Sequence, residues 1–127
     1  MNTINFDVRY NYDIEVDALF IYKVNYVGGS DYEESIELNA DIILDFDKEG
    51  FPIVLEVLNA SNVFKLPKSS IGNIDNIQMS VGISEKIINL NINMEVLNGN
   101  IKELKSTNSM AINDINLPNI DAELASV

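Results

Sequence analysis

Three acidic residues near the start of the sequence, Asp13, Glu15 and Asp17, have types and spacing that could do chemistry. In an extended segment, alternation places all three carboxylates on one side, as paired acids for glycoside hydrolysis require. Nothing in the neighbouring sequence marks a pocket around them. We therefore expect Asp13 to form a turn by accepting hydrogen bonds from backbone N–H groups, and Asp17 to cap the start of a strand.

A second acidic group has the spacing of a calcium-binding loop. Asp45, Asp47, Glu49, Gly50 and Glu56 occupy ligand and glycine positions of an EF-hand-like pattern, in which oxygen atoms surround a cation. Loops of that kind lie between helices, whereas both flanks here are rich in β-branched and apolar residues. The residues therefore predict a hairpin with an acidic tip and no metal. Asp45, Asp47, Glu49 and Glu56 are the candidate ligands of the alternative, a divalent-cation-binding protein or metal-dependent hydrolase.

The composition removes several classes of chemistry. The chain has 127 residues and contains no cysteine, histidine or tryptophan. Disulfides, thiolate metal sites and cysteine nucleophiles are therefore excluded. Without histidine, the chain also lacks the usual acid–base group at neutral pH and the commonest metal ligand. We expect a protein that is not an enzyme and that needs no cofactor.

Charge points to the kind of partner. The net charge is −12, and residues 1–64 hold 13 of the 20 acidic residues but only 3 of the 8 basic ones. The negative charge argues against nucleic acid as a partner, because its phosphates require clustered lysine and arginine. The acidic first half either keeps the protein soluble or forms a docking face for a basic protein partner.

Tyrosines are concentrated in the same acidic region. Their side chains suit either a core or a protein interface, where tyrosine is favoured; they are Tyr10, Tyr12, Tyr22, Tyr26 and Tyr32. An interface would combine some of them with the neighbouring acids. The predicted partner-binding residues are Tyr12, Asp13, Glu15, Asp17 and Tyr22.

Short β-strands should position these side chains in the first half. Ala18 to Val24 alternates strongly, with Leu19 and Ile21 on one face and Phe20 and Tyr22 on the other, which is typical of a strand packed on both sides. Lys48-Glu49-Gly50 joins two β-rich runs in the clearest hairpin, where glycine can take positive φ. The expected strands are Asp7 to Tyr10, Ala18 to Val24, Ser35 to Leu38 at an edge, Asp41 to Asp47 and Phe51 to Leu58.

The second half shows the cleanest alternation. From Ile87 to Leu97, branched and apolar residues alternate with asparagines, which predicts a half-buried antiparallel strand. Asn98-Gly99 is a two-residue hairpin signal, so residues 100–105 should return beside that strand. Strands near 74–81 and 120–124 would complete a meander. Residues 60–64 suit one helical turn, residues 84–90 are ambiguous between helix and strand, and Pro67 to Ser70 marks a boundary or hinge.

These elements predict an all-β fold, or an α+β fold if one short helix is counted. Antiparallel hairpins and a meander would form a sandwich-like or single curved sheet, with residues 1–64 and residues 65–127 sharing one core. No apolar run approaches the roughly 18 residues that span a bilayer, and no secretory signal is visible. We therefore expect a cytoplasmic protein that does not bind membranes.

Two blocks of residues resemble a known prokaryotic family. Tyr12-Asp13, Glu15 and Asp17-Ala18-Leu19 form the first block. The second runs from Asp41 to Gly50 and continues through Glu56-Val57-Leu58-Asn59-Ala60-Ser61. Over residues 6–64 the chain resembles domain-of-unknown-function family 2283, with residues 65–127 as the extension of a longer archaeal-type member. Val54 stands near the place where that family usually has a second glycine.

The resemblance implies a small β-rich domain without an established activity. Genes of this family often lie beside genes for small toxins, so the resemblance also implies an antitoxin-like role in binding a partner. Two hypotheses follow. The favoured one is a small cytoplasmic binding or self-assembling module, with a protein partner or a homo-oligomer. The other is the cation-dependent protein described above.

Overall fold

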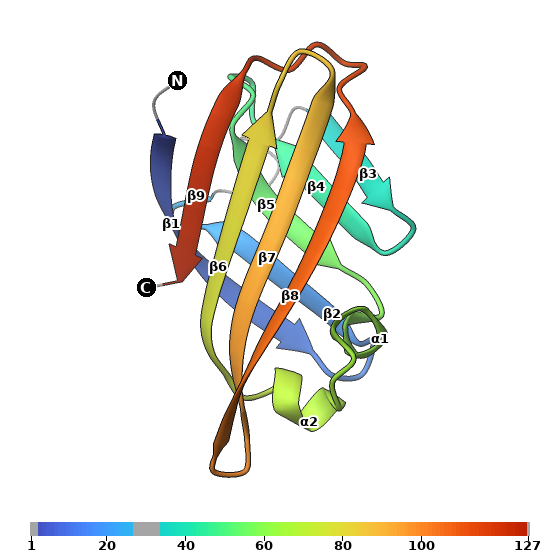
Figure 1. Ribbon diagram of the computed structural model, residues 1–127, viewed down its shortest axis with the longest axis vertical. Coiled ribbons are helices and arrows are strands. Elements are labelled where there is room, and N and C mark those ends of the chain that lie inside the picture. Colours follow the sequence, from blue (N-terminus) through green and yellow to red (C-terminus); the bar gives the residue numbers. More distant parts are fainter. Residues whose placement is uncertain (1–2, 27–33, 127) are drawn as a thin grey trace.

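The all-β prediction is confirmed by a computed structural model that describes residues 3–26 and 34–126. Nine strands and two short helices account for the regular structure of these residues (Figure 1). In chain order the elements are β1 Thr3–Asp13, β2 Ala18–Lys23, β3 Glu34–Asn39, β4 Ile42–Phe46, β5 Pro52–Val57, α1 Ala60–Phe64, α2 Lys68–Ile71, β6 Ile74–Ile83, β7 Ile87–Asn98, β8 Ile101–Ile112 and β9 Ile120–Ser126.

The nine strands form one curled sheet in the order β3-β4-β5-β2-β1-β9-β6-β7-β8. Strand β1 passes from one layer of the curled sheet to the other, since residues 3–8 pair with β9 and residues 8–13 pair with β2. We call β3, β4, β5, β2 and residues 8–13 the N-terminal layer, and residues 3–8 with β9, β6, β7 and β8 the C-terminal layer. Figure 1 shows the second layer in front of the first. The two sheet edges approach each other where the Asn39 side chain donates a hydrogen bond of 3.1 Å to Ser109 Oγ.

The core lies between the two layers and takes residues from both halves of the chain. Leu19, Ile21 and Leu55 of the N-terminal layer are fully buried, as are Ile88 and Ile92 of the C-terminal layer. Period-two alternation explains this arrangement because every second side chain of a strand points to the same face. On β7 the five predicted apolar positions are all buried: Ile88, Leu90, Ile92, Met94 and Val96.

The hairpin predicted around Lys48-Glu49-Gly50 is confirmed. Strands β4 and β5 pair antiparallel, and Gly50 has a φ of 85° in the connection. Pro52 begins β5, where the missing N–H is tolerated. The single helical turn expected at residues 60–64 is α1, and β3 is an edge strand as expected.

Several local predictions were wrong. Strand β1 continues through residue 13, beyond the predicted end at Tyr10, because residues 11–13 still pair with β2. Two other stretches were left open by the sequence. Pro67, in the predicted boundary or hinge, is the N-cap residue of α2, and residues 68–70 lie in that helix. Residues 84–90, which were ambiguous, contain a turn and the start of β7, with no helix.

The second half is also not a simple meander. Strand β9 lies between β1 and β6, parallel to β1, although it follows β8 in the chain. In the β7–β8 hairpin the two turn residues are Gly99 and Asn100, since Asn98 pairs with Ile101. Strand β8 then extends to Ile112, well beyond the predicted residue 105.

Tyr32, one of the tyrosines singled out in the sequence, lies outside the described residues. Within the ranges that the structure describes, no helix is long and apolar enough to cross a membrane.

Candidate functional site

The buried carboxylate of Asp17 is held by hydrogen bonds that cross between the two blocks singled out in the sequence. Tyr12 donates its hydroxyl to Oδ1 at 2.5 Å. Ser61 donates its backbone N–H to Oδ1 at 3.0 Å and its hydroxyl to Oδ2 at 2.6 Å. The carbonyl of Asp17 also accepts the Ala60 N–H at 3.0 Å. Asp17 therefore caps α1 from a distant turn, in place of Asn59, whose side chain makes no capping hydrogen bond.

This network shifts two pKa values in opposite directions. Burial is the largest single effect on Asp17 and raises the pKa of its carboxyl, but hydrogen bonds from Ser61 and Tyr12 together bring that pKa below its ordinary value. Burial and the hydrogen bond to Asp17 raise the pKa of the Tyr12 hydroxyl. Asp17 is thus an ionised acceptor and Tyr12 a neutral donor near pH 7. This pairing stabilises the fold and leaves neither group as an acid–base catalyst at that pH.

The remaining acids of the first block lie in the exposed turn between β1 and β2. Asp13 Oδ1 accepts the Glu15 N–H at 3.0 Å, as predicted for a turn-forming aspartate. Glu15 is exposed, whereas Asp17 points inward. The structure therefore separates the three carboxylates and does not align them as a catalytic pair.

The acidic hairpin uses its carboxylates in local hydrogen bonds. Asp47 Oδ1 accepts the N–H groups of Glu49 and Phe51 at 2.9 and 3.0 Å, which closes the turn. The Ser35 hydroxyl donates to Asp45 from the neighbouring strand. Across the described residues, no group of three or more aspartate, glutamate, histidine or cysteine side chains could hold a metal ion. The cation hypothesis gains no support from this geometry.

Pairing register brings a different set of side chains together on the outer face of the N-terminal layer. Residues directly opposite each other on paired strands share a face. One row across β1, β2, β5, β4 and β3 consists of Asn11, Phe20, Glu56, Ile43 and Glu37. The next consists of Arg9, Tyr22, Val54, Asp45 and Ser35. These two rows, with Tyr26, are named the acidic–aromatic face.

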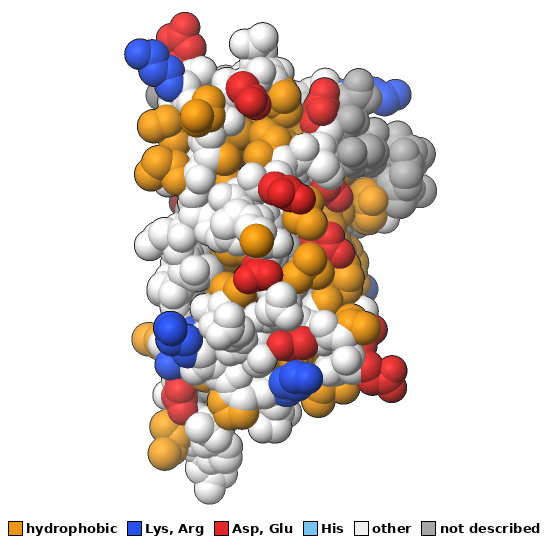
Figure 2. Space-filling view, turned by 90° about the vertical axis from the view of Figure 1, so that its right-hand side faces the viewer, with side chains coloured by type: hydrophobic (Ala, Val, Ile, Leu, Met, Phe, Trp, Pro, Cys, Tyr) orange, Lys and Arg blue, Asp and Glu red, His pale blue; other side chains and the backbone are white. Residues whose placement is uncertain are grey.

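The acidic–aromatic face combines apolar surface with negative charge. Phe20, Tyr22, Val54 and Ile43 are only half-buried, although they lie in the middle of the sheet. Three carboxylates, Glu37, Asp45 and Glu56, flank them, against the single cation of Arg9. Figure 2, which looks at the molecule from the β3 and β8 side, shows acidic side chains interspersed with hydrophobic ones.

A shallow depression of about 480 Å³ lies on this face. Six residues line it, four of them aromatic: Tyr10, Asn11, Phe20, Tyr22, Tyr26 and Val54. Aromatic rings present a negative face to a bound group and favour cations placed over them. The depression can therefore take an apolar or cationic side chain, but it brings no nucleophile and base together.

Among the predicted partner-binding residues, the structure places Tyr22 on this face. Asp13 lies in the exposed turn between β1 and β2, and Tyr12 donates a hydrogen bond to Asp17. Sequence reasoning missed Phe20, Val54, Glu37 and Ile43 as surface residues. The signal was present in the alternation of Ala18 to Val24, which placed Phe20 with Tyr22; it was assigned to a second packed face.

Comparison with known proteins identifies relatives. A family described as "Protein of unknown function (DUF2283)" matches residues 9–61. A protein of Methanosarcina mazei named "Putative hypoxanthine phosphoribosyltransferase" is 36% identical over 110 residues, which cover 87% of this chain and 85% of that protein. An uncharacterised protein of Methanocaldococcus jannaschii is 31% identical over 111 residues, or 87% of this chain and 91% of that protein. No solved structure matches.

These matches have a structural meaning. The family match begins at Arg9 and ends at Ser61, so it contains the acidic–aromatic face and the Asp17–Ser61 contact. The alignments to the two relatives are too long to fit within residues 1–64, so both relatives share part of the C-terminal layer as well.

Proposed function

Because the chain belongs to the DUF2283 family of proteins of unknown function, we propose a role for the layer that the family match covers: binding a basic segment of a partner protein. The protein acts as a binding module without catalysis. The observation that carries this proposal is the acidic–aromatic face, where Phe20 lies beside Glu56 and Val54 lies between Tyr22 and Asp45. Aromatic and apolar groups supply desolvated contact area, while the surrounding carboxylates select a partner of positive charge.

A rigid scaffold supports this face. Leu19, Ile21, Leu44 and Leu55 alternate with the exposed side chains and are fully buried, so the outer residues project from strands fixed by the core. The Asp17 network closes one end of the same layer. Little reorganisation is then needed on binding, which favours affinity.

The name of the Methanosarcina mazei relative raises phosphoribosyl transfer as another function. Such a reaction handles a diphosphate, which is bound by basic side chains, helix N-termini or metal ions. The face described above is acidic, and the described residues do not group carboxylates for a metal. No specific feature of the structure favours this activity, and we do not propose it.

Binding can be tested by nuclear magnetic resonance with the product of the adjacent gene as the partner. We expect its addition to shift the backbone signals of β2 and β5, while those of Asn89 to Asn93 on the C-terminal layer stay in place. Charge reversal in the double variant Asp45→Lys/Glu56→Lys should weaken binding more than about tenfold, since it converts attraction into repulsion.

Glu85→Lys provides a matched control because Glu85 is exposed in the turn before β7, far from this face. It carries the same change of charge per residue and should leave the affinity within about twofold at moderate salt. Absence of binding, or binding that the Asp45 and Glu56 changes do not weaken, would rule out the proposal for this partner and this face.

A further inference from the structure

Strand β8 has the reverse of the polarity expected for a sheet over a core. On β7, the inner side chains are apolar and three of the six outer ones are asparagine. On β8, Leu104, Met110 and Ile112 point outward, since they lie opposite Glu95, Asn89 and Ile87. Their exposed fractions are 75%, 58% and 74%. Among the residues that the structure describes, six of the nine large exposed hydrophobic ones belong to the β7–β8 hairpin, so apolar exposure is concentrated there.

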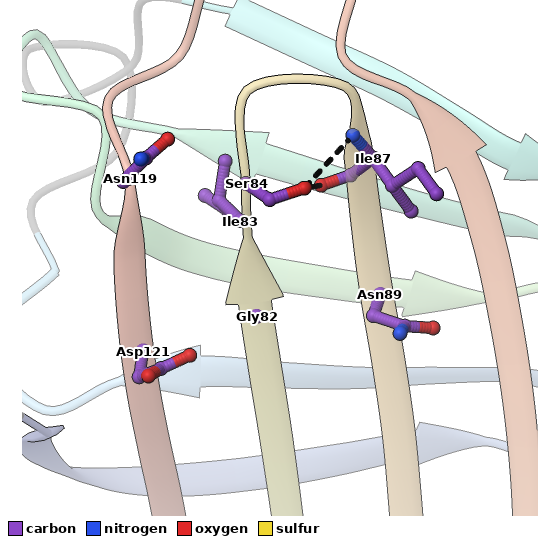
Figure 3. A pocket seen from close by; sticks show the side chains of 7 residues that line it. All are labelled: Gly82, Ile83, Ser84, Ile87, Asn89, Asn119 and Asp121. Carbon is purple, nitrogen blue, oxygen red and sulfur yellow. Dashed lines mark hydrogen bonds between the residues drawn. The ribbon is translucent and has the colours of Figure 1, made fainter. Parts of the chain in front are cut away.

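A hollow adjoins these exposed side chains. Gly82 lies in β6 directly opposite Asn89 of β7, and Asn89 in turn lies opposite Met110 of β8. Because glycine has no side chain, the outer face has a hollow there with a volume of about 330 Å³ (Figure 3). Residues of three strands line it, from Gly82 and Ile83 on β6 to Ile87 and Asn89 on β7 and Asp121 on β9. Glycine within a strand often marks a place where another chain approaches closely.

From Ile87 to Asn93 of β7, and at the paired positions of β6 and β8, the same outer face carries no ionisable group; Glu95 and Lys102 form an ion pair nearer the β7–β8 turn. The outward positions are glutamine, serine and glycine on β6 (Gln78, Ser80, Gly82), then isoleucine and asparagine on β7 (Ile87, Asn89, Asn91, Asn93). On β8 they are serine, asparagine, methionine and isoleucine (Ser106, Asn108, Met110, Ile112). In a chain of net charge −12 this is an unusual surface. Two copies, each strongly negative, can approach here without placing like charges against each other.

We propose that a second copy of this chain docks face to face on β6, β7 and β8, with Met110 of each copy inserted in the Gly82 hollow of the other. A two-fold axis in the interface, running nearly along β7, produces this arrangement. Because β6 and β8 flank β7 at equal strand spacings, the rotation places β8 of each copy over β6 of the other. The Asn89 side chains then meet on the axis. Asp121 and Glu123 of β9 lie at the rim of the contact, where Asp121 lines the hollow and Glu123 accepts a hydrogen bond of 2.6 Å from the Ser80 hydroxyl.

This geometry explains both unusual features together. The apolar side chains of β8 leave water when they pack against the second copy, where Met110 fills the hollow above Gly82. Each copy supplies one inserted methionine and one hollow. Sheet faces pack in this way at an angle near −30° in natural sandwiches. Figure 2 shows hydrophobic side chains gathered toward the upper left, at the end of the molecule where β8 finishes.

Light scattering during size-exclusion chromatography, with sedimentation equilibrium, tests the proposal. We expect the wild-type mass to rise from monomer to dimer with concentration. Met110→Glu should weaken dimerisation more than about tenfold, because it brings an unpaired carboxylate into the contact. Val16→Glu makes the same change at a residue of similar exposure, 64%, in the turn between β1 and β2, and should dimerise like the wild type. A wild type that stays monomeric at its highest soluble concentration overturns the proposal, as does a Met110→Glu dimer of unchanged affinity.

Filling the hollow gives a second test that adds no charge. A Cβ at Gly82 meets only Asp121 Oδ1, at 3.5 Å, so Gly82→Leu should fold normally, as thermal unfolding can verify. It should nevertheless weaken the dimer, because the hollow no longer admits Met110. The chain has no cysteine, so Asn89→Cys can be cross-linked by a short bifunctional thiol reagent at the axis. Asn11→Cys on the opposite layer should not cross-link. Equal cross-linking of both variants, or a Gly82→Leu dimer of unchanged affinity, contradicts the arrangement.

The proposed dimer does not depend on the proposed binding of a basic partner. The two surfaces lie on opposite layers, and among the dimer variants only the cross-linking control Asn11→Cys changes the acidic–aromatic face. A protein that binds its basic partner as a monomer would overturn the dimer alone.

Discussion

The carboxylate of Asp17 accepts the backbone N–H and the hydroxyl of Ser61, a residue 44 positions further along the chain. This contact joins the turn after β1 to the start of α1, the two ends of the region that the family match covers. Asp17 has a φ of 55°, a left-handed conformation that aspartate and asparagine tolerate better than most residues. Hydrogen bonds from residues 60 and 61 therefore constrain both the backbone and the side chain of Asp17.

Replacing Asp17 by asparagine should destabilise the protein by about 2 kcal/mol. Asparagine keeps the size of the side chain and tolerates the left-handed backbone, but it removes the charge that strengthens the hydrogen bonds from Tyr12 and Ser61. Urea unfolding measures the loss. Asp13→Asn is the control, since Asp13 is exposed and asparagine forms the same turn; it should cost less than about 0.5 kcal/mol. Equal losses for the two variants would contradict the structural role of Asp17.

Stability should also depend on pH through Asp17. The pKa of its carboxyl in the folded protein lies below the ordinary value, which is about 3.9 in an unfolded chain. A lowered folded-state pKa gives stabilisation that is fully present above the unfolded value and is lost as the pH falls through the folded one. The stability difference between wild type and Asp17→Asn should therefore be constant from about pH 5 to 8 and shrink below about pH 4. Urea unfolding at several pH values checks this, and a difference that stays constant into acid would contradict it.

Tyr12 and Ser61 should act as a coupled pair because both donate to the same carboxylate. Tyr12→Phe and Ser61→Ala each remove one hydroxyl donor, and each should cost about 1 to 2 kcal/mol. The double variant should deviate from the sum of the two by more than about 0.5 kcal/mol, since residues that share a partner are not additive. A double-mutant cycle from urea unfolding measures this coupling. Strict additivity would mean that the two donors stabilise the fold independently.

Among the four glycines that the structure describes, Gly50 should be the least tolerant of substitution. Its φ of 85° disfavours any side chain, and a Cβ there would lie 2.5 Å from Cδ of Pro118. Gly50→Ala should cost more than about 2 kcal/mol, from backbone strain and forced displacement of the proline ring. Gly99→Ala separates the two effects, because Gly99 has a φ of 67° but open space around it. Its loss, measured by thermal or urea unfolding, should be about 1 kcal/mol; a loss as large as that of Gly50→Ala would remove the role assigned to Pro118.

The alternation of apolar and polar residues predicted most strands, because this pattern depends on neighbouring residues alone. The alternation from Ile88 to Val96 directly reports which side faces the core, and the Gly50 turn is set by a single backbone conformation. The position of β9 could not be predicted in this way. Its apolar positions fit several partners, and its place between β1 and β6 is decided by contacts between the two ends of the chain.

The candidate surface was only partly predictable for the same reason. The sequence concentrated acids and tyrosines in the first half, and alternation separated Phe20 and Tyr22 from Leu19 and Ile21. Alternation does not show whether the face of Phe20 and Tyr22 is covered. In the structure the C-terminal layer packs on the face of Leu19 and Ile21 instead. The Asp17 network was equally hidden, since capping from a residue 44 positions away leaves no local signal.

A tryptophan in place of Phe20 should report partner binding directly. The chain has no tryptophan of its own, so Phe20→Trp introduces a single fluorophore into the acidic–aromatic face. Its emission should shift to shorter wavelength when the partner covers the depression, because the indole ring leaves water. Ile112→Trp is the matched probe on the C-terminal layer, where Ile112 is 74% exposed. It should respond to protein concentration as copies associate, and remain unchanged when the partner is added. If the partner alters the Ile112→Trp emission and leaves Phe20→Trp unchanged, the partner binds the C-terminal layer, and the assignment of the two surfaces is wrong.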